Sequence, residues 1–429
     1  MEKKTMKKFF FRRAIILFAG CFLWNISVGS CAALSLDDAI DMALKQNLDI
    51  SVALRGEDTA AANLDAALGA QKFSVAASSS WQMNRGPNSS SNNTAANSID
   101  LTLPIYTGGK NEATIDSKKY AVTQSQLNTV RTRETIILNT ITAYYDILEA
   151  EKTVEVDQEA VDKYQAHLVS VQQLYSAGSE ARVDVLSSEV DLSNAKQTLI
   201  KAKNTYEIDL STLRNILRMA GDEPLKLTDD FSYKPFDQTL PDCLTYALSN
   251  RKDLQSDQLA VEVAEKSVTI AAAGQKAQVS TFVDVDWDSD LPSQNDMSYV
   301  SGISASWNLF DSNVTNANIK AAKIAVETAK LELAQAQETV DLAVRQAYLN
   351  MREAEERFVS TQDAVQKAEE DYYIASEKYK AGEGLMLDIT DAQNSLSTAE
   401  LNYISAQYDY ARYKATLENT MGLSGGVNK

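Results

Sequence analysis

Several residue types that carry chemistry or shape loops are scarce in this sequence of 429 residues. A single histidine, His167, excludes a multi-histidine metal site and disfavours histidine-based catalysis, so it reads as an ordinary helix residue. Three cysteines exclude a disulfide-built scaffold, and 16 glycines with 6 prolines argue against an all-β or loop-rich protein. The formal charge of −18 disfavours a nucleic-acid partner. We find no catalytic constellation and expect neither an enzyme nor a cofactor.

The N-terminus has the order of a secretory signal peptide. Six basic residues within 3–13 precede an apolar stretch at 14–24, which is shorter than the ~20 residues of a membrane-spanning helix. Small residues at 30–33 follow, so we expect cleavage before Ala33 and a signal peptide at 1–32. Residues 28–31 also fit a lipoprotein box, with Cys31 as the lipidated residue. Cleavage leaves 35 basic and 58 acidic residues, a net charge of −23, and a single cysteine, Cys243.

The rest of the chain is a tandem duplication with a fixed offset of 204 residues and no gap. The matching segments are 36–40 with 240–244, 143–144 with 347–348, and 175–178 with 379–382. Each copy predicts a helix, a strand pair, a long helix and a shorter helix. We place the two repeats at 33–225 and 226–429.

The long helices are predicted from segments without glycine or proline. Residues 111–177 and 313–381 have neither, and their apolar residues recur at steps of three and four. A helix of nearly seventy residues is roughly 100 Å long, which indicates a rod and not a core element. Gly178 and Gly382 end the rods at equivalent positions, and shorter helices are expected at 182–217 and 385–421.

The strand pairs are predicted at about 74–105 and 278–310, where apolar and polar residues alternate. Trp81, Trp287 and Trp307 lie on the apolar faces, as in transmembrane barrel strands. Such barrels need at least about eight strands, and unpaired strand edges cannot face lipid. Four strands per chain therefore imply that two protomers share eight strands or that three share twelve.

These features together resemble the TolC-type outer-membrane efflux protein family. The resemblance rests on Leu36-Asp37-Asp38-Ala39-Ile40, on the two Tyr-x-x-Gly segments, and on their recurrence around two strand pairs. It implies a mostly α protein with transmembrane β: a trimeric channel whose 12-stranded β-barrel, four strands per protomer, continues into a long α-helical periplasmic barrel. It also implies a place in the bacterial outer membrane, spanning the periplasm.

The function implied by the resemblance is that of a passive exit duct in a tripartite efflux or type I secretion system. The expected partners are two further copies of the chain, outer-membrane lipid, a periplasmic adaptor and an inner-membrane pump. The alternative is a periplasmic adaptor or another structural coiled-coil protein, since long helices alone would suit either. Two complete helix–strand pair–helix repeats favour the duct.

The resemblance also assigns a periplasmic gate. Asp388 and Asp391 match its acidic positions, and their spacing puts both carboxylates on one helix face. Without the motif, these two residues would be interpreted as part of a solvated helix face. In a trimeric gate, their carboxylates would attract multivalent cations, which would block the channel. Tyr379 and Asp184 match latch positions and predict a hydrogen bond. The best-known family member has an arginine where this sequence has Gly384, and Arg182 is the candidate substitute.

Overall fold

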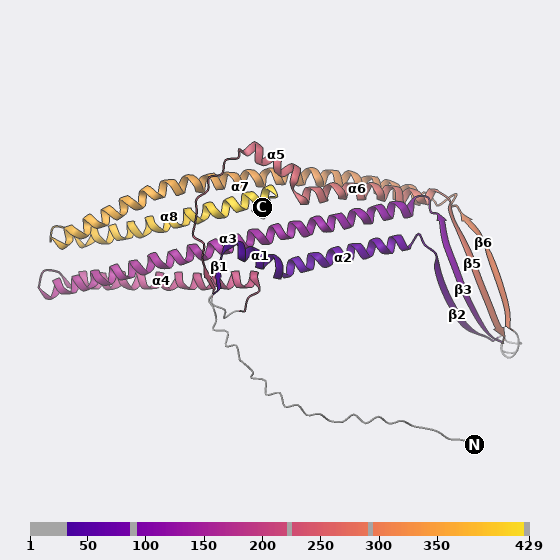
Figure 1. Cartoon of the computed structure of the whole chain (residues 1–429), viewed down its shortest axis with the longest axis horizontal. Helices are drawn as coiled ribbons and strands as arrows, with labels where there is room; N and C mark the ends of the chain where they lie inside the picture. Colours follow the sequence, from indigo (N-terminus) through magenta and orange to yellow (C-terminus); the bar gives the residue numbers. More distant parts are fainter. Residues whose placement is uncertain (1–31, 86–91, 221–224, 291–294, 424–429) are drawn as a thin grey trace, which may run out of the picture.

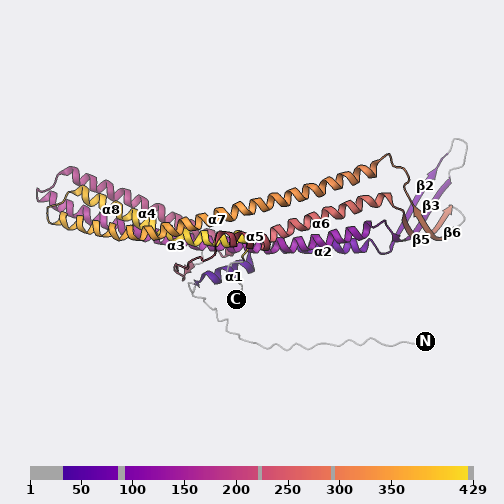
Figure 2. The same ribbon diagram turned by 90° about the horizontal axis from the view of Figure 1, so that it is seen from above.

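The computed structural model describes residues 32–85, 92–220, 225–290 and 295–423. These residues form a long helical body with a four-stranded sheet at one end (Figures 1 and 2). The expected signal peptide at 1–32, apart from Ala32, and the expected lipidation site Cys31 lie outside the described residues. Within the described ranges, no helix combines the length and the apolar character that a membrane span requires.

Eight α-helices are described, and the second four begin 204 residues after the first four. They are α1 Leu36–Gln46, α2 Leu48–Gly69, α3 Lys110–Ser176, α4 Arg182–Leu217, α5 Leu240–Asn250, α6 Lys252–Ala272, α7 Val314–Lys380 and α8 Met386–Met421. The helices α3 and α7 have 67 residues each, which corresponds to about 100 Å. Both run through most of the helical body, while the shorter helices pair with one half of them (Figure 1).

The helices lie four abreast at two levels. Near the sheet the order is α2, α3, α6 and α7, and at the far end it is α4, α3, α8 and α7 (Figure 1). Each long helix therefore exchanges its neighbours about halfway along its length. The outer helices of this layer are α2 or α4 on one side and α7 on the other.

Two helices, and not one, precede each strand pair because the chain bends at Asn47 and at Arg251. Asn47 has extended backbone, and its side-chain oxygen accepts the N–H of Asp49 at 2.8 Å as an N-cap of α2. Its amide donates to the carbonyl of Ile216 at 3.4 Å, and Arg251 donates to the equivalent carbonyl of Thr420 at 2.7 Å. Both side chains thus satisfy carbonyl groups at the end of α4 or α8.

The strands form one antiparallel sheet in the order β2, β3, β5, β6. Their bounds are β2 Ser74–Asn84, β3 Asn92–Tyr106, β5 Gln278–Asp290 and β6 Asn295–Ser306. The pairing of β3 with β5 joins the two repeats and leaves β2 and β6 as edges. The last strand ends before 310, the expected limit. Trp307 lies beyond it, and its indole donates to the carbonyl of Gln275 at 3.0 Å.

A second, two-stranded sheet lies midway along the helices (Figure 1). It pairs β1 Ala32–Leu34 with β4 Leu225–Leu227 in parallel. The proposed limit between the repeats, 225/226, falls inside β4. The hydroxyl of Tyr144 on α3 donates to the carbonyl of Leu34 at 3.0 Å and accepts the N–H of Asp229 at 3.2 Å. The linker between the repeats is therefore fastened to the first long helix.

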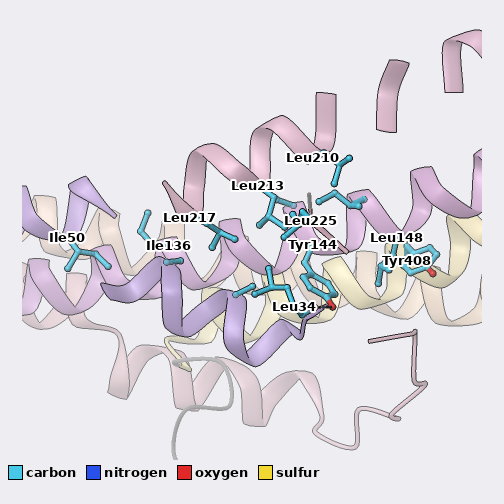
Figure 3. Close-up of a cluster of buried hydrophobic side chains, with 14 of the residues drawn as sticks. Leu34, Ile50, Ile136, Tyr144, Leu148, Leu210, Leu213, Leu217, Leu225 and Tyr408 are labelled. Carbon is cyan, nitrogen blue, oxygen red and sulfur yellow. Dashed lines mark hydrogen bonds between the residues drawn. The ribbon is translucent and has the colours of Figure 1, made fainter. Parts of the chain in front are cut away.

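Two hydrophobic cores surround this level. The first is built mainly from the first repeat, together with Ile404 and Tyr408 of α8, and the second from the second repeat. The first is centred on Tyr144, which is fully buried between α1, α3 and α4 (Figure 3). Many members of the second core lie 204 residues after members of the first, such as Ala43 and Ala247, Ile147 and Met351, and Leu213 and Leu417. The duplication in the sequence is thus also a duplication in packing.

Candidate functional site at the ends of the helical hairpins

The turns of the α3–α4 and α7–α8 hairpins lie at the end of the molecule opposite the sheet (Figure 1). Each turn depends on a glycine with left-handed backbone, φ +78° at Gly178 and φ +77° at Gly382. The N–H of Ser179 reaches the carbonyl of Leu174 at 2.9 Å, and the equivalent bond in the second hairpin is also 2.9 Å long. These are Schellman-type helix ends, which any residue with a Cβ would strain.

Asp184 and Asp388 are equivalent, and each caps the second helix of its hairpin. The carboxylate of Asp184 accepts the N–H of Ala181 at 3.1 Å, and that of Asp388 accepts the N–H of Leu385 at 3.2 Å. Both stand in the first helical turn, where a negative charge also interacts favourably with the helix dipole. These two carboxylates therefore fix the geometry of the turns.

The expected gate carboxylates, Asp388 and Asp391, are both exposed on α8. Leu385 and Leu387 beside them are also exposed, by 68% and 64%. The structure thus places two charged and two apolar side chains on an exposed surface at the end of the second hairpin.

The hydrogen bond expected between Tyr379 and Asp184 is replaced by another. Tyr379 is buried, and its hydroxyl donates to Oε1 of Glu180, which lies in the turn of the first hairpin, at 3.2 Å. Burial, together with the nearby Glu180 carboxylate, raises the pKa of Tyr379 to about 12. A tyrosine–carboxylate contact does link the two hairpins within one chain, but with a residue that the repeat pattern did not single out.

The absence of an arginine at position 384, where this chain has glycine, has a steric explanation. A Cβ at Gly384 would lie 2.9 Å from the backbone nitrogen of Tyr379, closer than real Cβ atoms come. The N–H of Gly384 also donates to the carbonyl of Lys378 at 3.1 Å, so the turn folds back on the end of α7. Arg182, the candidate substitute, is exposed and has no polar partner in the described part of the chain.

Further contacts join the hairpins above the turns. Tyr164 on α3 donates to the side-chain oxygen of Asn394 on α8 at 2.8 Å. Val171, Tyr379 and Ile389 form a small apolar cluster contributed by α3, α7 and α8. A crevice of about 380 Å³ lies beside this cluster and is lined by α3, α7 and α8.

A charged network joins the repeats nearer the middle of the molecule. Arg412 on α8 contacts Asp146 on α3 at 2.7 Å, Glu149 on the same helix, and Asp409 at 2.6 Å. Arg357 on α7 also contacts Asp409, at 2.9 Å. Burial raises the pKa of Asp146 and of Glu149. Burial acts in the same direction on Asp409, but hydrogen bonds from both arginines outweigh it and lower its pKa.

The described ranges contain no group of three or more His, Cys, Asp or Glu residues suited to hold a metal ion. The candidate functional surfaces of the described residues are the ends of the two helical hairpins and the open edges of the sheet, β2 and β6. Two long helical hairpins that continue into such a sheet define a protomer of a helical channel with a β domain.

Comparison with known proteins identifies the family. Residues 39–217 and 244–423 each match the family model described as "Outer membrane efflux protein", and the chain belongs to this family. Outer membrane efflux protein BepC of Brucella suis is 20% identical over 403 residues, covering 91% of this chain and 86% of BepC. Outer membrane protein TolC of Escherichia coli is 22% identical, covering 79% of this chain and 71% of TolC.

Solved structures show the same fold. The Campylobacter jejuni CmeC outer membrane channel superimposes with a TM-score of 0.80 at 20% identity, over 91% of this chain and 86% of CmeC. The protein is thus an outer-membrane exit duct for export that extends through the periplasm.

Proposed function

We propose that three copies of this chain close into one continuous duct. The observation that carries the proposal is that the sheet and the helices are both open layers with two free sides. The sheet runs from β2 at one edge to β6 at the other, and the helical layer runs from α2 or α4 on one side to α7 on the other. The edge strands β2 and β6 cannot remain unpaired in lipid, so β2 of one copy pairs with β6 of the next. Three copies supply twelve strands, whereas one copy cannot close a barrel.

The duct is a passive conduit without catalytic activity. It receives cargo from an inner-membrane pump through a periplasmic adaptor, in efflux or in type I secretion. The alternative function is that of a periplasmic adaptor or a structural coiled-coil protein. That function would not explain why the chain has a four-stranded sheet with two free edges.

The hairpin ends form the periplasmic gate. Asp388 and Asp391 of three copies bring six carboxylates around the axis, which bind multivalent cations and reduce conductance. The bond from Tyr379 to Glu180 holds the second hairpin against the first and favours the closed gate. Arg182 is available at the same end for a contact with a neighbouring copy. The carboxylate of Asp184 supports the gate by capping α4.

The remaining sequence-based assignments concern processing and repeat limits. We propose that the exported chain begins after a signal peptide at 1–32. We also propose that repeats at 33–225 and 226–429 share the strand β4 at their junction. Mass spectrometry of the mature N-terminus distinguishes cleavage before Ala33 from lipidation at Cys31.

Single-channel conductance in a planar bilayer tests the duct and its gate. The parent protein should show a small, cation-preferring conductance that millimolar divalent ions reduce. The double variant Asp388→Asn, Asp391→Asn should keep the conductance and lose the divalent block. Asp363→Asn, a change of an exposed carboxylate on α7 that pairs with Lys367, is the control and should leave the block intact. A parent protein that inserts but never conducts would contradict the duct.

A further inference from the structure

The only histidine of the sequence lies at the contact between the two hairpins. The ring of His167 on α3 packs against Tyr379 on α7, with 5.4 Å between ring centroids and 53° between planes. Its Nε2 atom is buried and has no hydrogen-bond partner among the described residues. The histidine is therefore part of the gate contact, and its interpretation as an ordinary helix residue is incomplete.

The neutral ring suits this position better than the charged one. A neutral imidazole carries one N–H, so the buried Nε2 can remain an unprotonated acceptor while the other nitrogen holds the proton. A second proton would place an N–H and a positive charge where no acceptor is available. Burial accordingly lowers the pKa of His167, and Asp191 on α4 offsets this effect only in part.

The charged groups on α3 near the ring are already paired. Lys163 contacts Glu159 at 3.0 Å, and Asp162 accepts a hydrogen bond from Gln158 at 3.2 Å. On α4, Asp191 is the charged group that acts on the ring, and burial raises the pKa of its own carboxyl. Neither helix supplies an acceptor for a proton on Nε2.

The groups that face the crevice from α7 and α8 do not supply one either. The Tyr372 ring lies 5.1 Å from the ammonium of Lys163, and Lys380 pairs with Glu377 at 2.8 Å. The hydroxyl of Tyr379 is directed to Glu180, and α8 contributes the apolar side chain of Ile389.

We propose that His167 is a proton-responsive element of the gate, whose protonation weakens its contact with Tyr379 between the two hairpin ends and favours the open duct. The inference rests on the proposed duct and gate. When the second hairpin moves away and Tyr379 leaves the ring, water reaches His167, and its pKa returns toward the ordinary 6.5. The bias toward opening begins as the pH falls below 6.5 and is complete below the lowered pKa of the closed form. Each pKa unit between the two forms multiplies the open-to-closed ratio about tenfold per protomer.

A direct measurement of this pKa uses the fact that the chain has one histidine. Untagged, histidine-labelled protein in detergent gives one imidazole signal by NMR, whose pH titration reports His167 alone. The expected pKa lies below 6.5 in the parent protein. It should rise toward 6.5 in the double variant His167→Gln, Gln165→His, which moves the histidine to an exposed position on the same helix. A parent pKa at or above that of the double variant would overturn the inference.

The functional test compares open probability at pH 7.5 and pH 5 in planar bilayers. The parent protein should open more at pH 5, whereas His167→Gln and the double variant should conduct without this increase. Conducting variants that keep the parent's pH dependence would overturn the inference and leave the duct standing. Parent protein without conductance at either pH would refute the duct itself, and with it the role of His167.

Discussion

Replacing Arg412 by glutamine removes the cation that three carboxylates share between the first repeat and the second. The side chains of Arg412 and Asp409 are 16% and 18% exposed, and Glu149 and Asp146 are 24% and 38% exposed. Breaking a buried ion pair costs about 3–5 kcal/mol because the remaining charge is uncompensated. With partial access to water, we expect a loss of about 2–4 kcal/mol at pH 7.5.

The assay is thermal unfolding of the purified, detergent-solubilised protein, followed by far-ultraviolet circular dichroism. The matched control is Arg345→Gln, which breaks a pair with Asp341 on the exposed face of α7, where the side chains are 48% and 40% exposed. Exposed pairs contribute about 0–1 kcal/mol, so this variant should melt close to the parent protein.

The pH dependence gives the prediction a second check. Burial already raises the pKa of Asp146 and of Glu149, and loss of Arg412 raises both further. As the pH falls through these raised pKa values, the two groups take up protons and their mutual repulsion ends. Asp409, with its lowered pKa, stabilises the parent above its ordinary value of 3.8, and this contribution is lost as the pH falls through the lowered value. The deficit of Arg412→Gln should therefore narrow at acid pH. Equal melting of the two arginine variants, or a deficit independent of pH, would refute the reasoning.

Three further changes test individual contacts. Tyr379→Phe removes the bond to Glu180, which is worth about 1 kcal/mol per protomer, and should raise open probability in bilayers; an unchanged value would remove this bond from the gate. Gly384→Ala forces the second hairpin turn to shift and should destabilise it by about 1–3 kcal/mol, with faster proteolysis at the turn. The control Gly69→Ala has open space around its Cβ and should be neutral or stabilising, so equal effects would argue against the steric explanation. Tyr144→Phe leaves the N–H of Asp229 without its partner and the carbonyl of Leu34 with only that of Thr228, and should lower stability by about 1–3 kcal/mol in the same melting assay; parent-like melting would show that water replaces the hydroxyl.

The fold class could be predicted because its main signals are local. Long segments without glycine or proline became α3 and α7, and the alternating segments became the strands. Gly178 and Gly382 end the long helices because each adopts positive φ, which the sequence alone indicates well. The free edges of the sheet follow from the number of strands in one chain.

The helix break before each strand pair was not predicted, for two different reasons. Asn47, followed two residues later by Asp49, is a recognisable capping signal, so the first break could have been found. Arg251 has no such local signal, because the carbonyl that it satisfies belongs to Thr420, 169 positions away. Periodicity within one helix carries no information about that partner.

The same limit applies to the gate contacts. Glu180 and Tyr379 are 199 positions apart, and His167 meets Tyr379 only because the ends of the two hairpins lie side by side in the folded chain. The repeat pattern identifies equivalent positions, whereas these contacts join positions that are not equivalent. Asp184 illustrates the difference, since its repeat position indicated importance but its partner is the backbone of its own turn.

The exchange of neighbours along the two long helices sets a strict condition on their length. One inserted residue would rotate everything below it by about 100° and shift it by 1.5 Å, so that α3 would offer the correct face to α2 and α6 but the wrong one to α4 and α8. Both helices have 67 residues, and a change in one alone would also put the two hairpin ends at different heights. Length changes are therefore tolerated only in near-whole turns, such as about seven or eleven residues, and only when both helices change together. The gapless spacing of the duplication thus keeps the rotation of α3 and the rotation of α7 about their own axes matched along their whole length.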